Sequence, residues 1–375
     1  MYTKFLCRLE ADLKKKRIKK KDISILFECT PANVTLIFKG KAAFHFSNFY
    51  KLAELLYEGE PDIFNRVMRE FCILSDRPDN EPMILEYLMN NGYFELAEEL
   101  AYKFDNPEFS PLYLLLMQRN RGAFVNKKQE MYRRTEQIKL NTNFTKETSK
   151  VMMEILTLYS FYDLNAWNVM LDLVDDVTEL VLQLEDSYFK HSMLIRVWEM
   201  KSTVFMARNE KEKAREMAWT IINSGNIYHF PIISAYALLA QLHAEHDYEQ
   251  SIQYIKKSLS LLEVVNKDFT IKRVQLEATH DFIRLIHNDF NELFLSDRAE
   301  VCHYHARLEG KENQDKCLSI LNEIERKRGE LTSFQLYYKG ICLRNQALLK
   351  VAIEGFQTGG NLFYASLIRS LASDL

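Results

Sequence analysis

Residues 236–259 read YALLAQLHAEHDYEQSIQYIKKSL, the pattern of two amphipathic helices joined by a short turn. Ala240 stands midway in the first half, Asp247 and Tyr248 stand at the turn, and Ser251 lies on the second half. Small side chains at these places allow the two helices of a pair to touch closely. The stretch therefore predicts a helical hairpin with a tight internal contact.

Related pairs recur towards the C-terminus of the chain. Ala207 is followed by Ala214, and Gly340 is followed by Ala352. Ser251 and Ala352 lie 101 positions apart, close to three periods of the roughly 34 residues typical of tetratricopeptide (TPR) repeats. The pattern predicts an all-α fold whose body is a TPR-like right-handed helical superhelix. The concave inner face of such a superhelix suits an extended peptide or a partner helix.

The composition supports a helical protein that stays inside the cell. The 375 residues include only 11 Gly and 7 Pro, fewer than turn-rich folds use. No apolar run approaches the roughly 20 residues of a membrane span, and the first residues do not resemble a signal peptide. The six cysteines are scattered without a C-x-x-C pair. These features predict a cytoplasmic protein with reduced cysteines.

Charge is distributed unevenly along the chain. Residues 1–41 hold eleven bases and four acids, a net charge of +7, whereas the whole chain carries −3. The remainder therefore carries −10. A basic head on an acidic body predicts a polyanionic partner for the head alone. The alternative is a solvated basic helix without a partner.

Residues 18–41 read IKKKDISILFECTPANVTLIFKGK and predict two short helices. Thr30 is a suitable N-cap for the second helix, Pro31 suits its first position, and Gly40 ends it. Two helices joined by so tight a turn form a helix-turn-helix unit, and the pattern resembles Xre/Cro-type domains. Glu28 takes the place of the usual turn glycine, so the turn must adopt a helical or mildly strained geometry.

In such domains the second helix enters the major groove of DNA by its N-terminal residues. The Asn33 side chain can pair with an adenine edge, and the methyl groups of Ala32 and Thr35 suit a thymine methyl. Flanking lysines would hold phosphates. The alternative is a two-helix packing element without DNA. The predicted DNA-binding residues are Lys19, Lys20, Lys21, Thr30, Pro31, Ala32, Asn33, Thr35, Lys39 and Lys41.

The expected domain boundaries follow from these motifs. Residues 1–60 form the helix-turn-helix domain, and 61–80 form a linker that begins at a Gly-Glu-Pro turn signal. Residues 81–360 form the peptide-binding superhelix, and 361–375 form a C-terminal helix for capping or dimerisation. The apolar stripe of this last helix either contacts a second copy or caps the superhelix core. It consists of Tyr364, Leu367, Ile368, Leu371 and Leu375.

With these features the sequence resembles the AimR arbitrium receptors of temperate phages, over most of the chain and best at 209–247 and 337–356. The resemblance implies a homodimer that binds a double-stranded DNA operator and activates a gene favouring lysis. It also implies a short signalling peptide, secreted and re-imported, that binds the superhelix and switches this activity off, favouring lysogeny. The C-terminal helix usually supplies the dimer contact in that family.

The resemblance also implies a peptide site on the inner helices. The family's Asn places fall on Thr203, Ala207 and Ala240, and its Arg place falls on His229, so none of the four keeps the family residue. The peptide is therefore expected to be different and less polar, or the chain responds to another signal. Other inner-helix residues complete the expected site, although each also suits a surface role. The predicted peptide-binding residues are Arg196, Glu199, Thr203, Ala207, His229, Tyr236, Ala240, His243 and Arg284.

Two other functions remain open. One is a TPR protein-interaction module that acts on a response regulator or another partner without sequence-specific DNA binding. The other is a scaffold that needs no small peptide. An enzyme is not expected, because no phosphate loop or nucleophile elbow is present. His243, His246 and the Cys-His-Tyr-His run at 302–305 lack a complete ligand set, so neither a metal nor another cofactor is expected.

Overall fold

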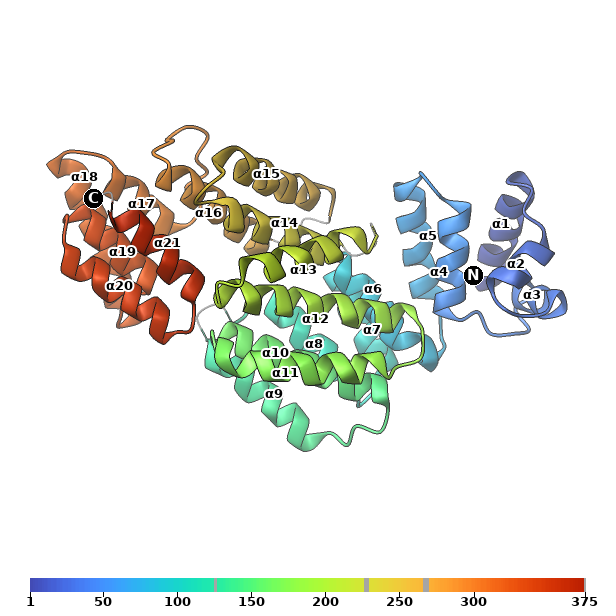
Figure 1. The fold of residues 1–375 in the computed structure, drawn as a ribbon. Helices are drawn as coiled ribbons and strands as arrows, with labels where there is room; N and C mark the ends of the chain where they lie inside the picture. Colours follow the sequence, from blue (N-terminus) through green and yellow to red (C-terminus); the bar gives the residue numbers. More distant parts are fainter. Residues whose placement is uncertain (125–126, 226–228, 266–269, 374–375) are drawn as a thin grey trace.

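The computed structural model describes residues 1–124, 127–225, 229–265 and 270–373. Over these residues the chain contains α-helices and one short 3-10 helix but no strand, which confirms the all-α prediction. From α6 to α21 each helix packs against the next along the chain, and the whole follows an elongated, curved path with the two termini at opposite ends (Figure 1). Within the described residues, no helix is long and apolar enough to cross a membrane.

The helices divide by position into a head, a body and a C-terminal part (Figure 1). The head comprises α1 (Tyr2–Lys15), α2 (Lys20–Leu26), α3 (Pro31–Phe38), α4 (Phe46–Leu56) and α5 (Pro61–Leu74). The body comprises η1 (Pro78–Asn80), α6 (Glu81–Asn90), α7 (Phe94–Phe104), α8 (Ser110–Asn120), α9 (Lys128–Asn141), α10 (Glu147–Asp163), α11 (Trp167–Leu182), α12 (Tyr188–Ala207), α13 (Lys211–Asn223), α14 (His229–His243), α15 (Tyr248–Val264) and α16 (Thr270–Ile286). The C-terminal part comprises α17 (Arg298–Arg307), α18 (Lys311–Arg328), α19 (Ser333–Cys342), α20 (Gln346–Thr358) and α21 (Leu362–Ser373).

Local sequence sets the bounds of α2 and α3, the two helices expected within 18–41. Thr30 Oγ1 accepts a hydrogen bond from the backbone N–H of Asn33 at 3.2 Å, the capping bond that its position predicts. Glu28 has φ +51, so the turn uses the left-handed region that a glycine would occupy without strain. Gly40, with φ +65, follows the end of α3.

The segment 61–80, expected as a linker, differs from that expectation. It contains the 14-residue helix α5 and then η1. Phe71 of α5 stacks on Phe49 of α4 with ring centroids 4.0 Å apart, and it is fully buried. A Gly-Glu-Pro sequence marks the end of one element, but proline also favours the first turn of a helix. The Gly-Glu-Pro sequence therefore marks the start of helix α5, and the hydrophobic core of the head extends through this helix.

Aromatic rings join the head to the body. Phe46 and Tyr50 of α4 each lie 5.2 Å, centroid to centroid, from the ring of Tyr188 at the start of α12. Phe46 also lies 6.0 Å from Tyr87 of α6. Buried Asn80 fixes the connection, because its Oδ1 accepts the backbone N–H of Phe46 at 2.8 Å. The orientation of the head therefore depends on contacts with α6 and α12.

Small residues lie where the paired helices touch, as the repeat pattern predicts. Ala214, Ala240 and Ala352 are fully buried. A Cβ atom added to Gly340 of α19 would lie 2.6 Å from Leu349 Cδ2 and 3.2 Å from the Leu349 backbone nitrogen of α20. Real Cβ contacts are not this short, so glycine permits the close approach of these two helices.

Replacing Gly340 by alanine is expected to lower the free energy of unfolding by about 1–3 kcal/mol, because the added methyl group overpacks the α19–α20 contact. Chemical denaturation measures this change. Gly355→Ala is the matched control in α20, since its methyl group would meet Ser333 Oγ, which can rotate away. That control should gain up to about 1 kcal/mol through helix propensity. Similar losses for both variants would contradict the close-approach account.

The C-terminal helix packs its apolar stripe inside the chain. Leu367 and Ile368 are fully buried, and Leu371 packs against the core, whereas Leu375 lies outside the described residues. The Tyr364 ring meets Phe334 edge-on at 4.8 Å, and its hydroxyl donates a hydrogen bond to Gln241 Oε1 of α14. The described part of the stripe therefore covers the chain's own core, the alternative to a dimer contact.

Candidate functional site

A cavity of about 350 Å³ opens on the inner side of the body, within the size range of ligand sites. Its wall comes largely from α8, α10, α12, α14 and α16, the first helices of successive pairs. The lining residues are Arg119, Asn120, Phe124, Lys128, Tyr159, Tyr162, Asp163, Asn165, Arg196, Glu199, Met200, Ser202, Thr203, Met206, Phe230, Ser234, Ala237, Leu238, Gln241, Ile271, Lys272 and Gln275. Charged and amide side chains predominate over aliphatic ones in this set.

A buried ion pair joins the cavity wall to α6, because Arg196 lines the cavity and its partner Glu86 lies behind it. Arg196 of α12 is 4 % exposed, and its Nε donates to Oε1 of Glu86 of α6, which is fully buried, at 2.7 Å. The same guanidinium donates to the Tyr159 hydroxyl at 3.0 Å and to Asn90 Oδ1 at 3.1 Å. Burial alone would lower the pKa of Arg196, but the Glu86 carboxylate holds that pKa well above its ordinary value. The pair ties α6, α10 and α12 together.

A second ion pair lies in the cavity wall. The Arg119 guanidinium donates to both carboxylate oxygens of Asp163, at 2.9 and 2.8 Å. It also stacks over the Tyr159 ring, 4.3 Å from the centroid. Burial opposes the charged form of Arg119, but Asp163 raises the pKa above its ordinary value. Bidentate pairing and stacking leave this arginine with few free donors.

Three further charges of the lining form no ion pair among the described residues: the exposed Lys128, and Glu199 and Lys272 within the wall. Lys272 Nζ donates to Ser234 Oγ at 2.8 Å and lies 5.1 Å from the centre of the Phe230 ring. Burial lowers the pKa of Lys272, while Glu199 opposes that shift. Glu199 accepts only a long hydrogen bond, 3.5 Å, from the Tyr159 hydroxyl.

The cavity contains three of the predicted peptide-binding residues. Arg196, Glu199 and Thr203 lie on α12 and line the wall. The charged residues Arg119, Asp163 and Lys272 were missed, because they stand outside the stretches with the clearest repeat motif. A charge on the first helix of a pair was the signal that could have identified them.

The other predicted residues are placed elsewhere. Ala207 and Ala240 are buried at helix contacts, and Ser251 Oγ donates to the Ala240 carbonyl at 2.6 Å. His243 packs on the Tyr254 ring at 5.5 Å between α14 and α15. Tyr236 lines a different cleft. The side chain of His229 lies outside the described residues.

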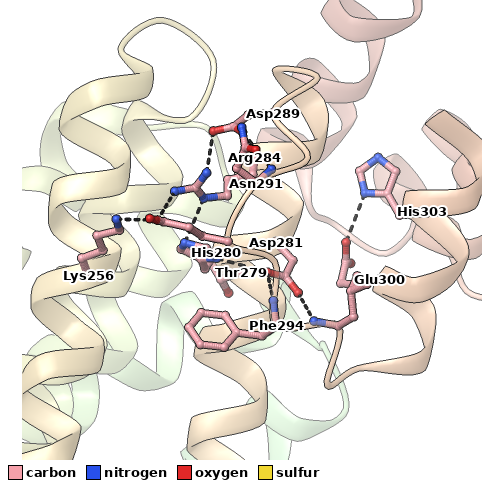
Figure 2. A network of polar contacts seen from close by, with 12 residues as sticks. Lys256, Thr279, His280, Asp281, Arg284, Asp289, Asn291, Phe294, Glu300 and His303 are labelled. Atoms are coloured by element: carbon pink, nitrogen blue, oxygen red, sulfur yellow. Dashed lines mark hydrogen bonds and ion pairs between the residues drawn. The ribbon is translucent and has the colours of Figure 1, made fainter. Parts of the chain in front are cut away.

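Arg284 contacts the loop between α16 and α17 (Figure 2), and it does not line the cavity. Its guanidinium pairs with Asp289 at 2.5 Å and with Glu292 at 2.8 Å, and its Nε donates to His280 Nε2 at 3.1 Å. The neighbouring Asp281 carboxylate accepts two backbone N–H groups of the same loop, at 3.0 and 2.7 Å. This network anchors the loop between α16 and α17.

A second cleft, of about 840 Å³, lies between the head and the body. Tyr50 and Leu55 of α4 line one side, and Ile232 and Tyr236 of α14 line the other. Helix α14 also contributes Ser234 and several neighbours to the inner cavity. One helix therefore separates the inner cavity from the cleft beside the head.

The exposed surface of α3 carries Asn33, the polar side chain expected to pair with a base. Pro31, Ala32 and Asn33 are exposed. Thr35 Oγ1 donates to the Pro31 carbonyl at 3.0 Å, so its hydroxyl is engaged within the helix. The Thr30 hydroxyl is likewise engaged in the N-cap. Asn33 is therefore the exposed side chain on α3 best suited to recognition by hydrogen bonds.

The lysines near α3 differ in their partners. Lys20 Nζ pairs with Glu10 at 2.9 Å and is partly buried. Four others are exposed, and they form no ion pair among the described residues. These four, called the free head lysines below, are Lys19, Lys21, Lys39 and Lys41.

Comparisons with known proteins agree with this architecture. A family model described as AimR transcriptional regulator-like matches residues 65–370. The uncharacterized protein pXO2-35 of Bacillus anthracis is 27 % identical over 234 residues, which cover 61 % of this chain and 86 % of that protein. The fold is similar to selenomethionine phAimR, with TM-score 0.61 and 15 % identity, over 99 % of this chain and 96 % of that one. It is also similar to phAimR with its ligand, with TM-score 0.74 and 15 % identity, over 88 % of this chain and 98 % of that one. The chain belongs to the AimR transcriptional regulator-like family, a family of regulators and not of enzymes.

Proposed function

We propose that this chain is a DNA-binding transcriptional regulator controlled by a short signalling peptide that binds in the inner cavity. The observation that carries the proposal is the polar cavity on the inner side of the body, in a chain of a regulator family. The regulator acts in the cytoplasm of a bacterial host, as a homodimer, and governs the choice of a phage between lysis and lysogeny.

The cavity lining supports a peptide as the ligand. Asn120, Asn165 and Gln275 place amide groups along the wall. Amides both donate and accept, as the backbone of an extended peptide requires. The similar protein phAimR is known with a ligand. A peptide that spans these amides would contact several first helices at once.

The head supports DNA as the partner. Asn33 is exposed at the start of α3 among the free head lysines. Lysines contribute affinity through phosphates, and an asparagine can read an adenine edge. Two heads in a homodimer would read two half-sites at a set spacing.

The position of α14 supports a link between peptide binding in the cavity and DNA binding by the head. This helix faces the ligand cavity on one side and the cleft beside the head on the other. A peptide shifts the regulator only by its different affinity for two arrangements of the molecule. Movement of α14 on peptide binding would change the cleft and hence the orientation of the head.

Selection of genomic DNA fragments by the purified full chain tests the DNA proposal. Wild type is expected to enrich one site with two related half-sites at moderate salt. Asn33→Ala should lose this enrichment, because a bidentate base contact contributes about 1–3 kcal/mol of discrimination. Asn141→Ala, which removes an exposed asparagine of α9, is the matched control and should select as wild type does. Equal enrichment by wild type and Asn33→Ala would contradict the assignment of Asn33.

One observation favours a second function, a head that binds a protein. Ile25 of α2 is 71 % exposed, and Leu36 of α3 is 43 % exposed. Large aliphatic side chains on a surface suit a protein partner better than a phosphate backbone. The chain would then be a TPR protein-interaction module that acts on a response regulator or a similar partner. Binding of an acidic receiver domain, without any fragment enrichment, would favour this function.

A further inference from the structure

The cleft between the head and the body is a second ligand-sized space. It shares no described lining residue with the inner cavity. Its volume of about 840 Å³ falls within the range of sites for small molecules. Helices α4 and α5 line it from the head, and α13, α14 and α15 line it from the body. A molecule in this cleft would therefore contact both parts of the chain.

Aromatic rings line the cleft from both sides. Phe64 of α5 and Tyr236 of α14 are half-buried, so part of each ring remains accessible. Tyr50 and Tyr87 lie deeper, 6 % and 1 % exposed, and the Tyr50 ring meets Phe64 edge-on at 5.6 Å. Aromatic faces carry partial negative charge, so they attract cations as well as apolar groups.

Two carboxylates line the cleft on the side of the head. Glu54 and Glu58 form no ion pair among the described residues. The Tyr50 hydroxyl donates a hydrogen bond to Glu54 Oε1 at 3.2 Å. Burial raises the pKa of Glu54, and this hydrogen bond opposes the shift. The exposed Glu54 carboxylate is therefore partly dehydrated, without an ion pair to compensate for the lost water.

Lys257 is the basic residue of the cleft lining that the structure describes. It lies on α15, in the opposite wall, and it is exposed. Two glutamates against one lysine give the described lining a net charge of −1, with the negative charge on the side of the head. A cation beside α4 would meet the carboxylates and lie across the cleft from the lysine.

We propose that this cleft is a second ligand site, which binds a small organic cation with an apolar body. The ammonium group lies beside Glu54 and Glu58, and the apolar body packs against Phe64 and Tyr236. The carboxylates supply charge, and the aromatic faces supply both apolar contact and attraction for the cation. Because such a ligand contacts the head and the body together, it would restrict movement of the head. The site is independent of peptide binding in the inner cavity.

The test uses the full-length protein and three probes with the same hexyl chain: hexyltrimethylammonium, 1-hexanol and hexanoate. Calorimetry measures the affinity of each probe at low and at high salt. The double variant Glu54→Gln with Glu58→Gln removes both carboxylates, and Tyr236→Leu removes one aromatic face. The matched control changes Glu95 and Glu99, two exposed residues of α7, to glutamine, because it alters the net charge equally outside the cleft.

Hexyltrimethylammonium is expected to bind wild type more tightly than 1-hexanol does, and hexanoate should bind least tightly. High salt should weaken binding of the ammonium probe alone, because it screens the partly exposed carboxylates. The variant without Glu54 and Glu58 should bind the ammonium probe about fivefold to thirtyfold more weakly and 1-hexanol as wild type does. Tyr236→Leu should weaken ammonium binding by about threefold to tenfold. The control variant should bind all three probes as wild type does.

Four results would overturn the inference. Equal affinities for hexyltrimethylammonium and 1-hexanol would show that the cleft does not recognise positive charge. Tightest binding of hexanoate, weakened by Lys257→Gln, would make the cleft an anion site. Ammonium binding that is unchanged in the glutamate variant would place the bound probe elsewhere. Failure of all three probes to bind would show that the cleft is not a site for such ligands.

Melting of the unliganded variants provides the folding control. Glu54 and Glu58 are exposed, so the glutamate variant should melt as wild type does. Tyr236 is half-buried and lies 6.2 Å from the Tyr254 ring, so its replacement can lower the melting temperature. If Tyr236→Leu does not fold, the glutamate variant and its matched control decide the question.

Discussion

Arg196→Met is expected to lower the free energy of unfolding by about 3–5 kcal/mol, the usual cost of leaving one partner of a buried ion pair alone. Glu86 is fully buried, and Arg196 is its cationic partner. The substitution also removes donors from Tyr159 and Asn90. Chemical denaturation followed by circular dichroism measures the change. We expect peptide binding to fall as well, since Arg196 lines the cavity.

Two companion variants distinguish the buried charge from a general packing defect. Adding Glu86→Leu to Arg196→Met removes the stranded carboxylate, so the double variant should recover part of the stability. Arg133→Met removes an exposed partner of Glu130 and should cost less than about 1 kcal/mol. A double variant less stable than the single one would show that packing, and not the unpaired charge, dominates the loss.

Replacing all four free head lysines, Lys19, Lys21, Lys39 and Lys41, by glutamine is expected to weaken binding to duplex DNA by about a thousandfold or more at 0.1 M salt. This expectation rests on the proposed DNA-binding role. Each lysine that meets a phosphate releases a counterion and contributes roughly 0.9 to the salt slope of log affinity, so the slope should become shallower by about 3.6. Fluorescence anisotropy with labelled duplexes over about 0.05–0.2 M salt measures both quantities.

Lys20→Gln is the matched control for the head lysines. Lys20 pairs with Glu10 and lies 5.9 Å from the Phe38 ring, so it is partly neutralised before DNA arrives. The single variant should change the slope by less than the change per lysine in the fourfold variant. A salt slope that stays the same in the fourfold variant would refute phosphate binding by this face of the head and favour a protein partner.

Helix α6 connects the cavity with the head. Adjacent residues of this helix face different neighbours: Glu86 pairs with Arg196 of the cavity wall, and Tyr87 packs in the aromatic cluster that holds the head. Tyr188 of the same cluster begins α12, the helix that also carries Arg196 and Glu199. A ligand that shifts α12 would therefore move the support of the head together with the cavity wall.

Sequence reasoning succeeded where short-range interactions decide the structure. The Thr30 N-cap, the strained turn at Glu28 and the end of α3 near Gly40 depend on neighbours within a few residues. The close helix contact at Gly340 was also predictable, because the repeat places small residues at a regular position. Such features are encoded by local chemistry and by periodicity.

Prediction from the sequence was ambiguous where one local pattern is compatible with two structures. The Gly-Glu-Pro sequence at 59–61 suits a linker and equally suits the start of α5, and only the stacking of Phe71 on Phe49 shows which it is. The apolar stripe of α21 is compatible both with a dimer contact and with the chain's own core. Leu367 and Ile368 are buried and pack in the core, and a dimer contact by this helix stays a prediction.

The sequence by itself determined the class of fold, the small residues at several helix contacts and the basic character of the head, because these follow from the spacing of apolar, small and charged residues. Only the tertiary structure decided which side chains form the cavity. Arg196 meets Glu86 across 110 positions of sequence, and Lys272 meets Ser234 across 38. No local pattern encodes such pairs, because the packing of helices that are distant in sequence brings them together.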